Sequence, residues 1–343
     1  MRANFLFGPG QVALRQVADP LLTETTDAIV RITASCICGS DLHPYRDQTP
    51  HPAGRPIGHE FIGVVEQVGA EVHTVTVGDF VIAPFAVSCG HCEFCVARLT
   101  TSCLNSSYWG ADGSAAQAEA IRVPTADGTL VKVPGPVDPG LYPSLLTLSD
   151  VYGTGYHAAV SARVSAGDAV TVIGDGAVGL LAVLSAKLLG AEQIILMGRH
   201  EHRTELGRVF GATEVVAERG QEGIERVREL SGGHGTAKVL EAVGLLPAYE
   251  QALGVVRDGG TISRVGVPQY TTGPMGRELF GRNLTLTGGV APVRSYIPQL
   301  LPGVLSGKVN PGLVFDRVLP LDEIAEGYEL MDSRAAIKVM IRN

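Results

Sequence analysis

The sequence lacks the features of a nucleic-acid-binding protein. It contains no run of lysine and arginine residues, and its 27 basic residues are outnumbered by 35 acidic ones, which gives a formal net charge of −8 at pH 7. Proteins that bind nucleic acid usually present a basic patch to the phosphate backbone. We therefore expect no nucleic-acid partner.

The sequence also lacks segments that would direct the chain into or across a membrane. Its first ten residues, MRANFLFGPG, have no apolar core of the kind found in secretory signals. The longest apolar tract, residues 169–191, is interrupted by Asp175, Lys187 and four glycines, and it is interpreted as a buried strand, turn and helix. We expect no membrane partner and a cytoplasmic location.

The composition and patterning of the chain indicate a two-domain globular protein of the α/β class. Its 343 residues exceed the size at which a single core usually keeps growing, and 45% of them are hydrophobic. The first 150 residues contain short β-rich runs such as 61–68 and 80–83. Further along, apolar runs at 170–173, 193–197, 237–242, 261–265 and 284–287 alternate with helical stretches, which predicts a doubly wound parallel sheet. The segment from residue 291 loses this alternation and is expected to return to the first domain.

A glycine motif follows the first strand of the alternating region and reads Gly174-Asp175-Gly176-Ala177-Val178-Gly179. In such a motif the first glycine permits a tight turn, the second lets the backbone approach a pyrophosphate, and the third lets the helix pack against the strand. The phosphates then lie at the helix N-terminus, where free N–H groups favour an anion. The motif predicts a Rossmann domain that binds a dinucleotide.

The residues at the end of the next strand bear on which dinucleotide is bound. An acidic residue that would bind the ribose 2′-hydroxyl of NAD is expected there, but the chain has Gly198, Arg199 and His200, with Arg203 about one helical turn on. Guanidinium groups suit a 2′-phosphate, so NADP is favoured over NAD. The alternatives are an ordinary solvated turn and a ribose contact from Glu201. Val265 and Gly266, which end a later apolar run, are assigned to the same cofactor site.

Four cysteines lie within fifteen residues: Cys89, Cys92, Cys95 and Cys103. Clustered cysteines in a chain of this length without an export signal more often bind metal than form disulfides. A bacterial ferredoxin motif would have three residues before the last cysteine and then a proline, whereas here seven residues intervene and a leucine follows. Four thiolates close a tetrahedral zinc site that has no position for water, so the sequence predicts structural zinc.

Three further segments carry a family resemblance. They are residues 38–43 (CGSDLH), 58–60 (GHE) and 149–157 (SDVYGTGYH). Together with the glycine motif and the four cysteines, and in this order, they resemble the medium-chain, zinc-dependent alcohol dehydrogenase family, closest to its NADP-type and formaldehyde-dehydrogenase-like branch. The resemblance extends over nearly the whole chain. It implies a β-rich, GroES-like catalytic domain at 1–150, an inserted Rossmann domain at 151–290, and a return to the catalytic domain at 291–343.

The same resemblance assigns a catalytic zinc site. Cys38, His59 and Asp150 are its implied ligands, with Glu60 as an alternate ligand, so each chain would hold two zinc ions. Three protein ligands leave one position for water or a substrate oxygen. Asp41 is expected to orient the His59 ring.

A proton path and two contacts near the substrate are implied in the same way. Ser40 would accept the substrate proton, and His43 would exchange it with solvent after passage through the nicotinamide ribose. Thr154 is expected near the nicotinamide, and His157 is expected to be a packed helix residue. Trp109 would form either an apolar wall of the substrate cleft or part of the core. Cys36 is interpreted as a small buried residue.

The sequence therefore predicts an enzyme that transfers a hydride between an alcohol, or its aldehyde or ketone, and NAD(P). The alternatives are a zinc-independent quinone or enoyl reductase of the same superfamily and a non-enzymatic redox sensor that binds a nucleotide. Primary or secondary alcohols, polyols, an amino alcohol and a formaldehyde adduct all remain possible substrates. The resemblance implies a homodimer or homotetramer.

Overall fold

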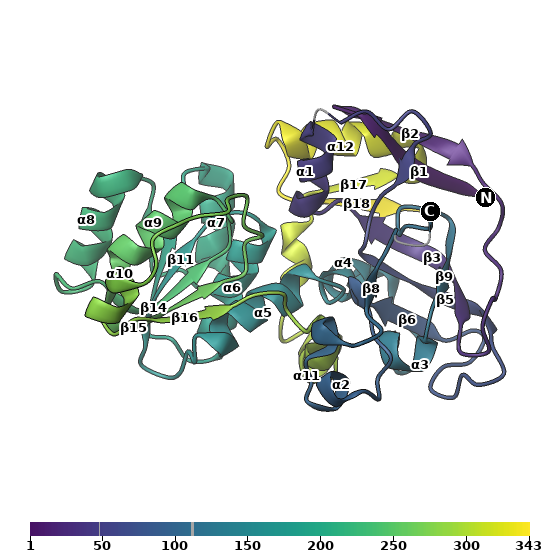
Figure 1. The fold of residues 1–343 in the computed structure, drawn as a ribbon, viewed down its shortest axis with the longest axis horizontal. Coiled ribbons are helices and arrows are strands. Elements are labelled where there is room, and N and C mark those ends of the chain that lie inside the picture. Colours follow the sequence, from purple (N-terminus) through teal and green to yellow (C-terminus); the bar gives the residue numbers. More distant parts are fainter. Residues whose placement is uncertain (48, 111–112) are drawn as a thin grey trace. The chain divides into compact units, whose positions relative to one another are not determined.

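A computed structural model describes residues 1–47, 49–110 and 113–343. Two compact units make up the chain, one formed by Met1–Gly153 with Pro292–Asn343 and the other by Thr154–Ala291 (Figure 1). The sequence expectation placed the boundaries after residues 150 and 290, and the units change after 153 and 291. Ala111 and Asp112, which follow Trp109 and Gly110 in the segment compared with a substrate cleft, lie outside the described ranges.

The first unit is built on a mainly antiparallel sheet with the order β10-β6-β5-β3-β18-β17, in which β9 also pairs with β3. Val30 and Ile32 of β3 pack with Phe61 and Val65 of β5 in its core. The C-terminal strand β18 pairs antiparallel with β3, so residues at the two ends of the sequence share one sheet. The strands of this sheet are β3 (Ala28–Cys36), β5 (Phe61–Val68), β6 (Phe80–Ala83), β9 (Ala120–Val123), β10 (Val131–Lys132), β17 (Arg317–Pro320) and β18 (Val339–Arg342).

Smaller elements complete the first unit. A three-stranded sheet contains β1 (Arg2–Gly8), β2 (Gln11–Gln16) and β4 (Arg55–Pro56), and a two-stranded sheet contains β7 (Ala86–Val87) and β8 (Ser107–Tyr108). The α-helices are α1 (Leu42–Arg46), α2 (Glu93–Val96), α3 (Ala126–Thr129), α4 (Tyr142–Thr147), α11 (Val293–Leu305) and α12 (Ile324–Asp332). Short 3₁₀ turns are η1 (Gly39–Asp41), η2 (Thr100–Ser102), η3 (Pro139–Leu141), η4 (Pro311–Val314) and η5 (Leu321–Glu323). Helix α5 (Val151–Ser161) begins in the first unit and ends in the second.

The second unit is a six-stranded parallel sheet with the order β13-β12-β11-β14-β15-β16. Its strands are β11 (Ala169–Ile173), β12 (Gln193–Met197), β13 (Glu214–Val216), β14 (Thr236–Glu241), β15 (Val256–Arg264) and β16 (Thr285–Gly288). The strand order reverses between β11 and β14, which is where ligands bind in open parallel sheets. The predicted doubly wound α/β fold is confirmed.

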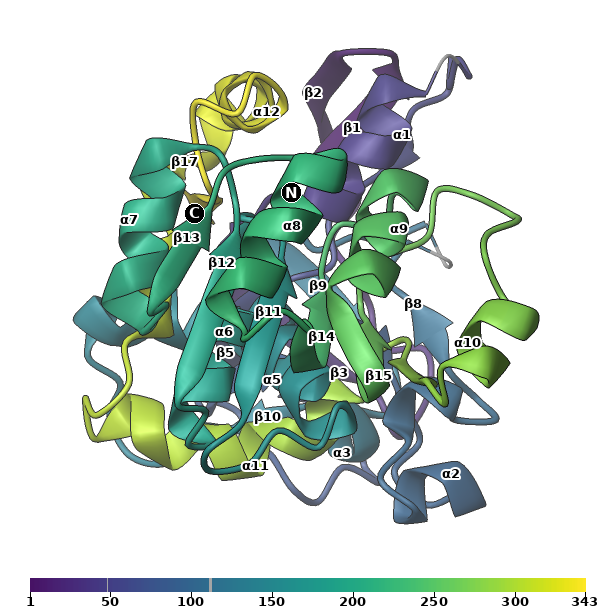
Figure 2. The same cartoon turned by 90° about the vertical axis from the view of Figure 1, so that its left-hand side faces the viewer.

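Helices cover this parallel sheet. Helices α8 and α9 lie over one face of the sheet (Figure 2). Val227 of α8 and Tyr249 of α9 pack with Ile173, Ile195 and Val239 of the strands in one apolar cluster. The helices of the unit are α6 (Ala177–Leu188), α7 (Glu201–Phe210), α8 (Gly220–Leu230), α9 (Leu246–Val255) and α10 (Arg277–Gly281). Within the described ranges, none of the helices combines the length and apolar character that crossing a bilayer requires.

Candidate metal centres and nucleotide site

Cys38, His59, Glu60 and Asp150 come together at one edge of the antiparallel sheet. Ser35 of β3 pairs with Phe61 of β5, so the residues that follow β3 and those that precede β5 leave the sheet at the same edge. One ligand atom from each of the four residues lies within 4.8 Å of the others. Asp150 Oδ2 is 3.7 Å from Cys38 Sγ and 3.4 Å from His59 Nε2.

The chemistry of this group suits a divalent cation. A thiolate, an imidazole and a carboxylate are all established zinc ligands. Lys338 donates to Glu60 Oε1 at 2.7 Å, while Glu60 Oε2 is buried without a hydrogen-bond partner among the described residues. An unsatisfied buried carboxylate oxygen beside a thiol and a second carboxyl group is costly unless a positive charge is present. The donor set therefore fits the zinc ion that the sequence implies.

Burial and neighbouring charges shift the pKa values of two of these groups. Burial and the negative charge of Glu60 raise the pKa of Cys38. Burial lowers the pKa of His59, but the negative charges of Asp41 and Cys38 raise it by more, so that it lies well above its ordinary value. Metal binding requires a thiolate and a neutral imidazole, so a cation that binds here displaces protons.

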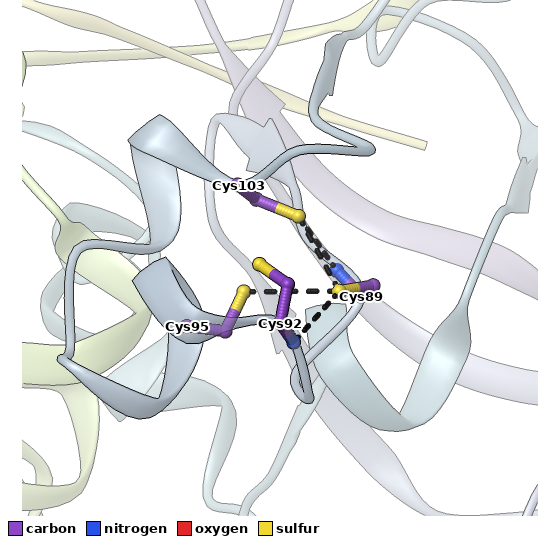
Figure 3. Close-up of side chains that lie close together, drawn as sticks. All are labelled: Cys89, Cys92, Cys95 and Cys103. Carbon is purple, nitrogen blue, oxygen red and sulfur yellow. Dashed lines mark hydrogen bonds between the residues drawn. The ribbon is translucent and has the colours of Figure 1, made fainter.

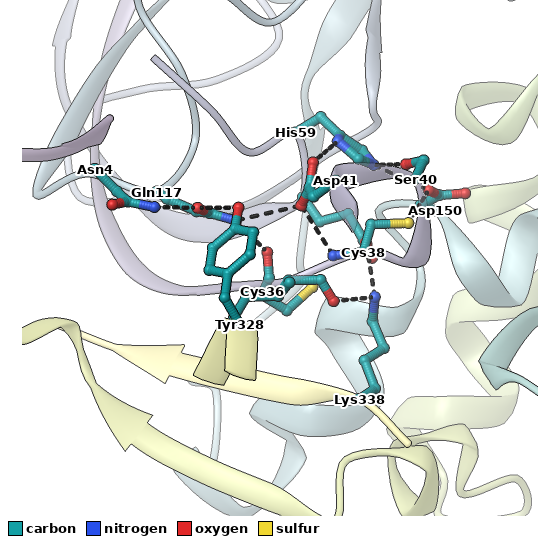
Figure 4. A network of polar contacts seen from close by, with 12 residues as sticks. Asn4, Cys36, Cys38, Ser40, Asp41, His59, Gln117, Asp150, Tyr328 and Lys338 are labelled. Atoms are coloured by element: carbon teal, nitrogen blue, oxygen red, sulfur yellow. Dashed lines mark hydrogen bonds and ion pairs between the residues drawn. The ribbon is translucent and has the colours of Figure 1, made fainter. Parts of the chain in front are cut away.

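Asp41 contacts two residues of the ligand group, Cys38 and His59. Its Oδ2 accepts a hydrogen bond from the backbone N–H of Cys38 at 2.9 Å, and its Oδ1 is 3.2 Å from Nδ1 of His59 (Figure 4). The η1 turn brings Asp41 back toward Cys38, because the N–H of Asp41 donates to the Cys38 carbonyl. A His59 ring whose Nδ1–H donates to Asp41 presents the lone pair of Nε2 to a metal.

The other residues of the implied proton path lie in or near this group. Ser40 Oγ is 3.5 Å from Nε2 of His59. His43 is half-buried in α1, where burial and the positive charge of Arg46 lower its pKa. Thr154 is buried in the part of α5 that belongs to the second unit. In the same unit, His157 Nε2 is 3.3 Å from the Gly288 carbonyl oxygen, and burial lowers the pKa of His157.

Trp109 packs on the core of the first unit. Its ring meets Phe61 edge-on at a centroid distance of 5.2 Å, and its Nε1 donates to the carbonyl oxygen of Pro84 at 2.9 Å. Phe61 directly follows Glu60 in the sequence, so the indole ring packs on a residue that is next to the ligand group along the chain. Cys36 is fully buried.

The four clustered cysteines face one another (Figure 3). Cys103 Sγ is 3.5 Å and Cys95 Sγ is 4.0 Å from Cys89 Sγ. An ideal tetrahedron with zinc–sulfur distances of about 2.3 Å has sulfur–sulfur edges of roughly 3.8 Å. A disulfide would require about 2.05 Å, and all four cysteines are free thiols. The geometry fits one zinc ion bound by four thiolates.

Backbone N–H groups support negative charge on these sulfurs. The N–H of Cys92 donates to Cys89 Sγ at 3.4 Å, and the N–H groups of Cys89 and Asn105 each donate to Cys103 Sγ at 3.3 Å. Hydrogen bonds from the N–H groups of Cys95 and Leu104 lower the pKa of Cys92 to about 6, whereas burial raises that of Cys95 to about 12.

This contrast predicts the order of alkylation in metal-free protein. After chelation at pH 7, iodoacetamide should modify Cys92 first, because a pKa of about 6 leaves it mainly as thiolate. Peptide mass spectrometry after brief exposure measures the order, with fully buried Cys36 as the internal control. Restored zinc should protect Cys92. Equal labelling with and without zinc would contradict a metal site here.

The glycine motif forms the turn that its sequence predicts. Gly174 has φ +114°, which requires glycine, and α6 begins at Ala177 with Gly176 as its N-cap. A Cβ on Gly179 would lie 1.9 Å from the Gly174 carbonyl oxygen, so helix and strand approach too closely for a side chain. A Cβ on Gly176 would meet no described atom within 4 Å, which leaves an open side at the helix N-terminus. This open side suits a pyrophosphate.

The loop after β12 is held by Asp175, a residue that the sequence reasoning did not assign. Its Oδ2 accepts from the backbone N–H groups of Arg199 and His200 at 3.0 Å each and is 2.8 Å from His200 Nδ1. Burial raises the pKa of Asp175, but hydrogen bonds from His200 lower it by more, so that the pKa lies below its ordinary value. A Cβ on Gly198 would lie 2.6 Å from Asp175 Cβ. Its position as an acidic residue between the first two glycines of the motif was the signal in the sequence that could have pointed to this role.

The assigned cofactor residues differ in exposure. Arg199 is exposed, whereas Arg203 is buried in α7 with only 8% of its surface accessible. Val265 and Gly266 follow β15, and both backbone N–H groups donate to the Glu241 carbonyl oxygen at the end of β14. These positions lie beside the point where the strand order reverses.

Comparisons with known proteins identify the family of this chain. Residues 24–135 match the model of the alcohol dehydrogenase GroES-like domain, and residues 177–305 match that of the zinc-binding dehydrogenases. Zinc-type alcohol dehydrogenase B of Aspergillus flavus is 35% identical over 351 aligned positions that cover 100% of this chain and 81% of the relative. L-threonine 3-dehydrogenase of Bacillus subtilis is 30% identical over 92% of this chain and 90% of its own length.

A solved structure extends this similarity to three dimensions. Alcohol dehydrogenase TADH from Thermus sp. ATN1 superposes with a TM-score of 0.91 at 35% identity and covers 100% of this chain and 99% of its own. Both family models and relatives over the full length thus agree with the fold. The chain belongs to the medium-chain, zinc-dependent alcohol dehydrogenase family.

Proposed function

We propose that this enzyme transfers a hydride between an alcohol, or the corresponding aldehyde or ketone, and a nicotinamide dinucleotide. The observation that carries the proposal is the convergence of Cys38, His59, Glu60 and Asp150 within 4.8 Å, in a chain that also forms a dinucleotide-binding turn. Membership of the family makes the chain an oxidoreductase that acts on small-molecule alcohols with zinc and NAD(P). The finer assignments below are proposals.

Cys38, His59 and Asp150 would hold the catalytic zinc ion, and the four clustered cysteines would hold a structural one. A catalytic zinc ion supplies Lewis acidity, which stabilises the negative charge that develops on a substrate oxygen. Glu60 is the alternate ligand, because its Oε2 is buried without a partner among the described residues while Lys338 retains its Oε1.

Ser40 and His43 would handle the proton. Ser40 Oγ lies beside the ligand group, 3.5 Å from Nε2 of His59, where it can accept the proton of a substrate hydroxyl. His43 would exchange that proton with solvent after passage through the nicotinamide ribose. Since burial lowers its pKa, His43 is mainly neutral at pH 7 and able to take up a proton. Thr154 is assigned to the nicotinamide and Trp109 to the substrate.

NADP is the proposed cofactor of choice. No carboxylate follows β12 directly, and Gly198 has no room for one because a Cβ there would meet Asp175. Arg199 is exposed next to the turn and is the guanidinium available to a 2′-phosphate. Arg203 would contribute its charge from a buried position. The protein is further proposed to form a homodimer or homotetramer, which would cover exposed apolar side chains such as Phe280 and Met275.

The proposal is tested with a panel of alcohols and aldehydes and both cofactors, following the absorbance of the reduced nicotinamide. We expect turnover of at least one alcohol and a higher kcat/KM with NADP than with NAD. Arg199→Ala should reduce kcat/KM for NADP by roughly tenfold, as for the loss of a charge-assisted hydrogen bond, and leave NAD unchanged. Arg208→Ala, at an exposed position of α7, the helix that follows this loop, is the control. A strong NAD preference would overturn the cofactor assignment.

The same panel separates the proposed function from its two alternatives. A zinc-independent reductase would reduce quinones or enoyl compounds and keep that activity after chelation. A redox sensor would bind the nucleotide without turning over any alcohol or carbonyl compound. Alcohol oxidation that is lost on chelation and restored by zinc supports the proposed function.

A further inference from the structure

The side-chain amide of Gln117 lies behind Asp41, on the side away from His59. Gln117 Nε2 is 3.3 Å from Asp41 Oδ2 and 3.2 Å from the Cys36 carbonyl oxygen, and it donates to both. Its Oε1 accepts from Asn4 Nδ2 and from the Tyr328 hydroxyl, each at 2.9 Å (Figure 4). An amide has two donor hydrogens and two acceptor lone pairs, and here all four are used.

These partners fix the direction in which the amide faces. Asp41 Oδ2 and the Cys36 carbonyl can only accept, and Asn4 Nδ2 can only donate. Exchanging the amide oxygen and nitrogen would place an acceptor against two acceptors and a donor against a donor. Tyr328 is fully buried, and Gln117 is 0% and Asp41 5% exposed, so each mismatched group would also lack water as a partner.

Backbone contacts also hold Gln117 at this place. The N–H of Asn4 donates to the Gln117 carbonyl oxygen at 2.8 Å, which ties residue 117 to β1. On the other side, Gly58 immediately precedes His59, and a Cβ there would lie 2.4 Å from Gln117 Cγ. Gly58 has φ +102°, a conformation that favours glycine, so the chain reaches His59 directly over the Gln117 side chain.

We propose that Gln117 is a positioning residue that, through Asp41, orients His59 for metal binding, with Tyr328 fixing the amide. Among the described residues, Asp41 receives hydrogen bonds from Cys38, Gln117 and His59, and only the one from Gln117 comes from outside the ligand segments. Without it, the carboxylate can turn about its terminal torsion, and the His59 ring loses its fixed direction. The inference rests on the proposed function, because it needs a metal at Cys38, His59 and Asp150.

Gln117→Met tests the proposal. The variant has nearly the same length, but a thioether has no hydrogen to donate to Asp41. Loss of a hydrogen-bonding partner behind a metal ligand typically weakens metal binding by roughly 10–100-fold. We therefore expect the zinc affinity of the Cys38 site to fall by roughly that factor in chelator competition, while the four-cysteine site of the same molecule keeps its affinity and serves as the internal reference.

Tyr328→Phe provides a milder variant in case Gln117→Met fails to fold. It removes only the hydroxyl that fixes the amide, and zinc affinity at the Cys38 site should fall by a smaller factor, up to roughly tenfold. Tyr45→Phe is the matched control, because its ring lies 5.0 Å from the Tyr328 ring in the same core and has no contact with Gln117 among the described hydrogen bonds. Tyr45→Phe should bind zinc like the parent protein.

The outcomes separate the inference from the proposed function. If folded Gln117→Met and Tyr328→Phe both bind zinc at the Cys38 site within twofold of the parent, the positioning role is wrong, although the zinc enzyme stands. If the parent itself holds only the zinc of the four-cysteine site, the proposed function fails and the inference fails with it. A selective loss at the Cys38 site, in protein that unfolds at the parent temperature, supports the inference.

Discussion

Cys38→Ser is expected to lower kcat/KM for alcohol oxidation by roughly a thousandfold, because Lewis-acid stabilisation of a developing charge contributes several kcal/mol and about 1.4 kcal/mol corresponds to a factor of ten. Serine is a poor zinc ligand, and Asp150 and His59 alone leave the cation weakly held. The measurement is steady-state kinetics with the best alcohol of the panel, together with the zinc content of the purified variant.

Cys36→Ser is the control for this experiment. Cys36 is a fully buried thiol only two residues away on β3, but it is outside the ligand group. The control should retain zinc and most of the activity. Dinucleotide binding should be unchanged in Cys38→Ser, since the glycine turn belongs to the second unit. Parent-like alcohol oxidation by Cys38→Ser would show that the reaction does not depend on this metal site.

Gly176→Ala and Gly179→Ala are expected to have different effects, the first on dinucleotide binding and the second on stability, although the two glycines belong to one motif. Gly176 has φ −80° and an unobstructed Cβ direction, so alanine should leave folding unchanged and instead occupy space that the pyrophosphate needs. Overpacking typically costs about 1–3 kcal/mol, which corresponds to roughly 5- to 150-fold weaker dinucleotide binding. Calorimetric titration with NADP and NAD measures the change.

At Gly179 the added methyl group should act on stability. Its Cβ would lie 1.9 Å from the Gly174 carbonyl oxygen, so the helix has to move away from the strand. We expect the second unit to lose about 1–3 kcal/mol of stability or more, seen as a lower unfolding temperature without ligand. If Gly176→Ala bound both dinucleotides as tightly as the parent, the open side of the turn would not be the pyrophosphate site.

Much of the fold and the local chemistry could be predicted from short stretches of sequence. Ranges 61–68, 80–83 and 193–197 were expected as strands and form β5, β6 and β12, because their apolar patterns reflect local burial. The helix after the glycine motif begins at Ala177, directly after Gly176, which serves as its N-cap. The alternation of strands and helices after residue 170 was sufficient to predict the parallel sheet.

The contacts behind the ligands could not be predicted in this way. Lys338 meets Glu60 across 278 positions of sequence, and Gln117 meets Asp41 across 76. Neither pair leaves a periodic or motif signal, because the contact arises from strands that pair far apart in the chain. Asp175 was overlooked for a different reason. It lies within the glycine motif, but at one of the positions where the motif does not specify a residue type.

The sequence by itself determined the chemical groups of this protein: four thiols at short spacing, a glycine turn between strand and helix, and a thiol, an imidazole and a carboxylate in three segments. These are local properties, since neighbours along a chain remain neighbours in any fold. Only the tertiary structure decided that Ser35 pairs with Phe61, which brings Cys38 and His59 to one sheet edge, and that a buried amide stands behind Asp41. Such long-range pairings depend on which surfaces the whole chain buries together, and burial is a property of the folded molecule.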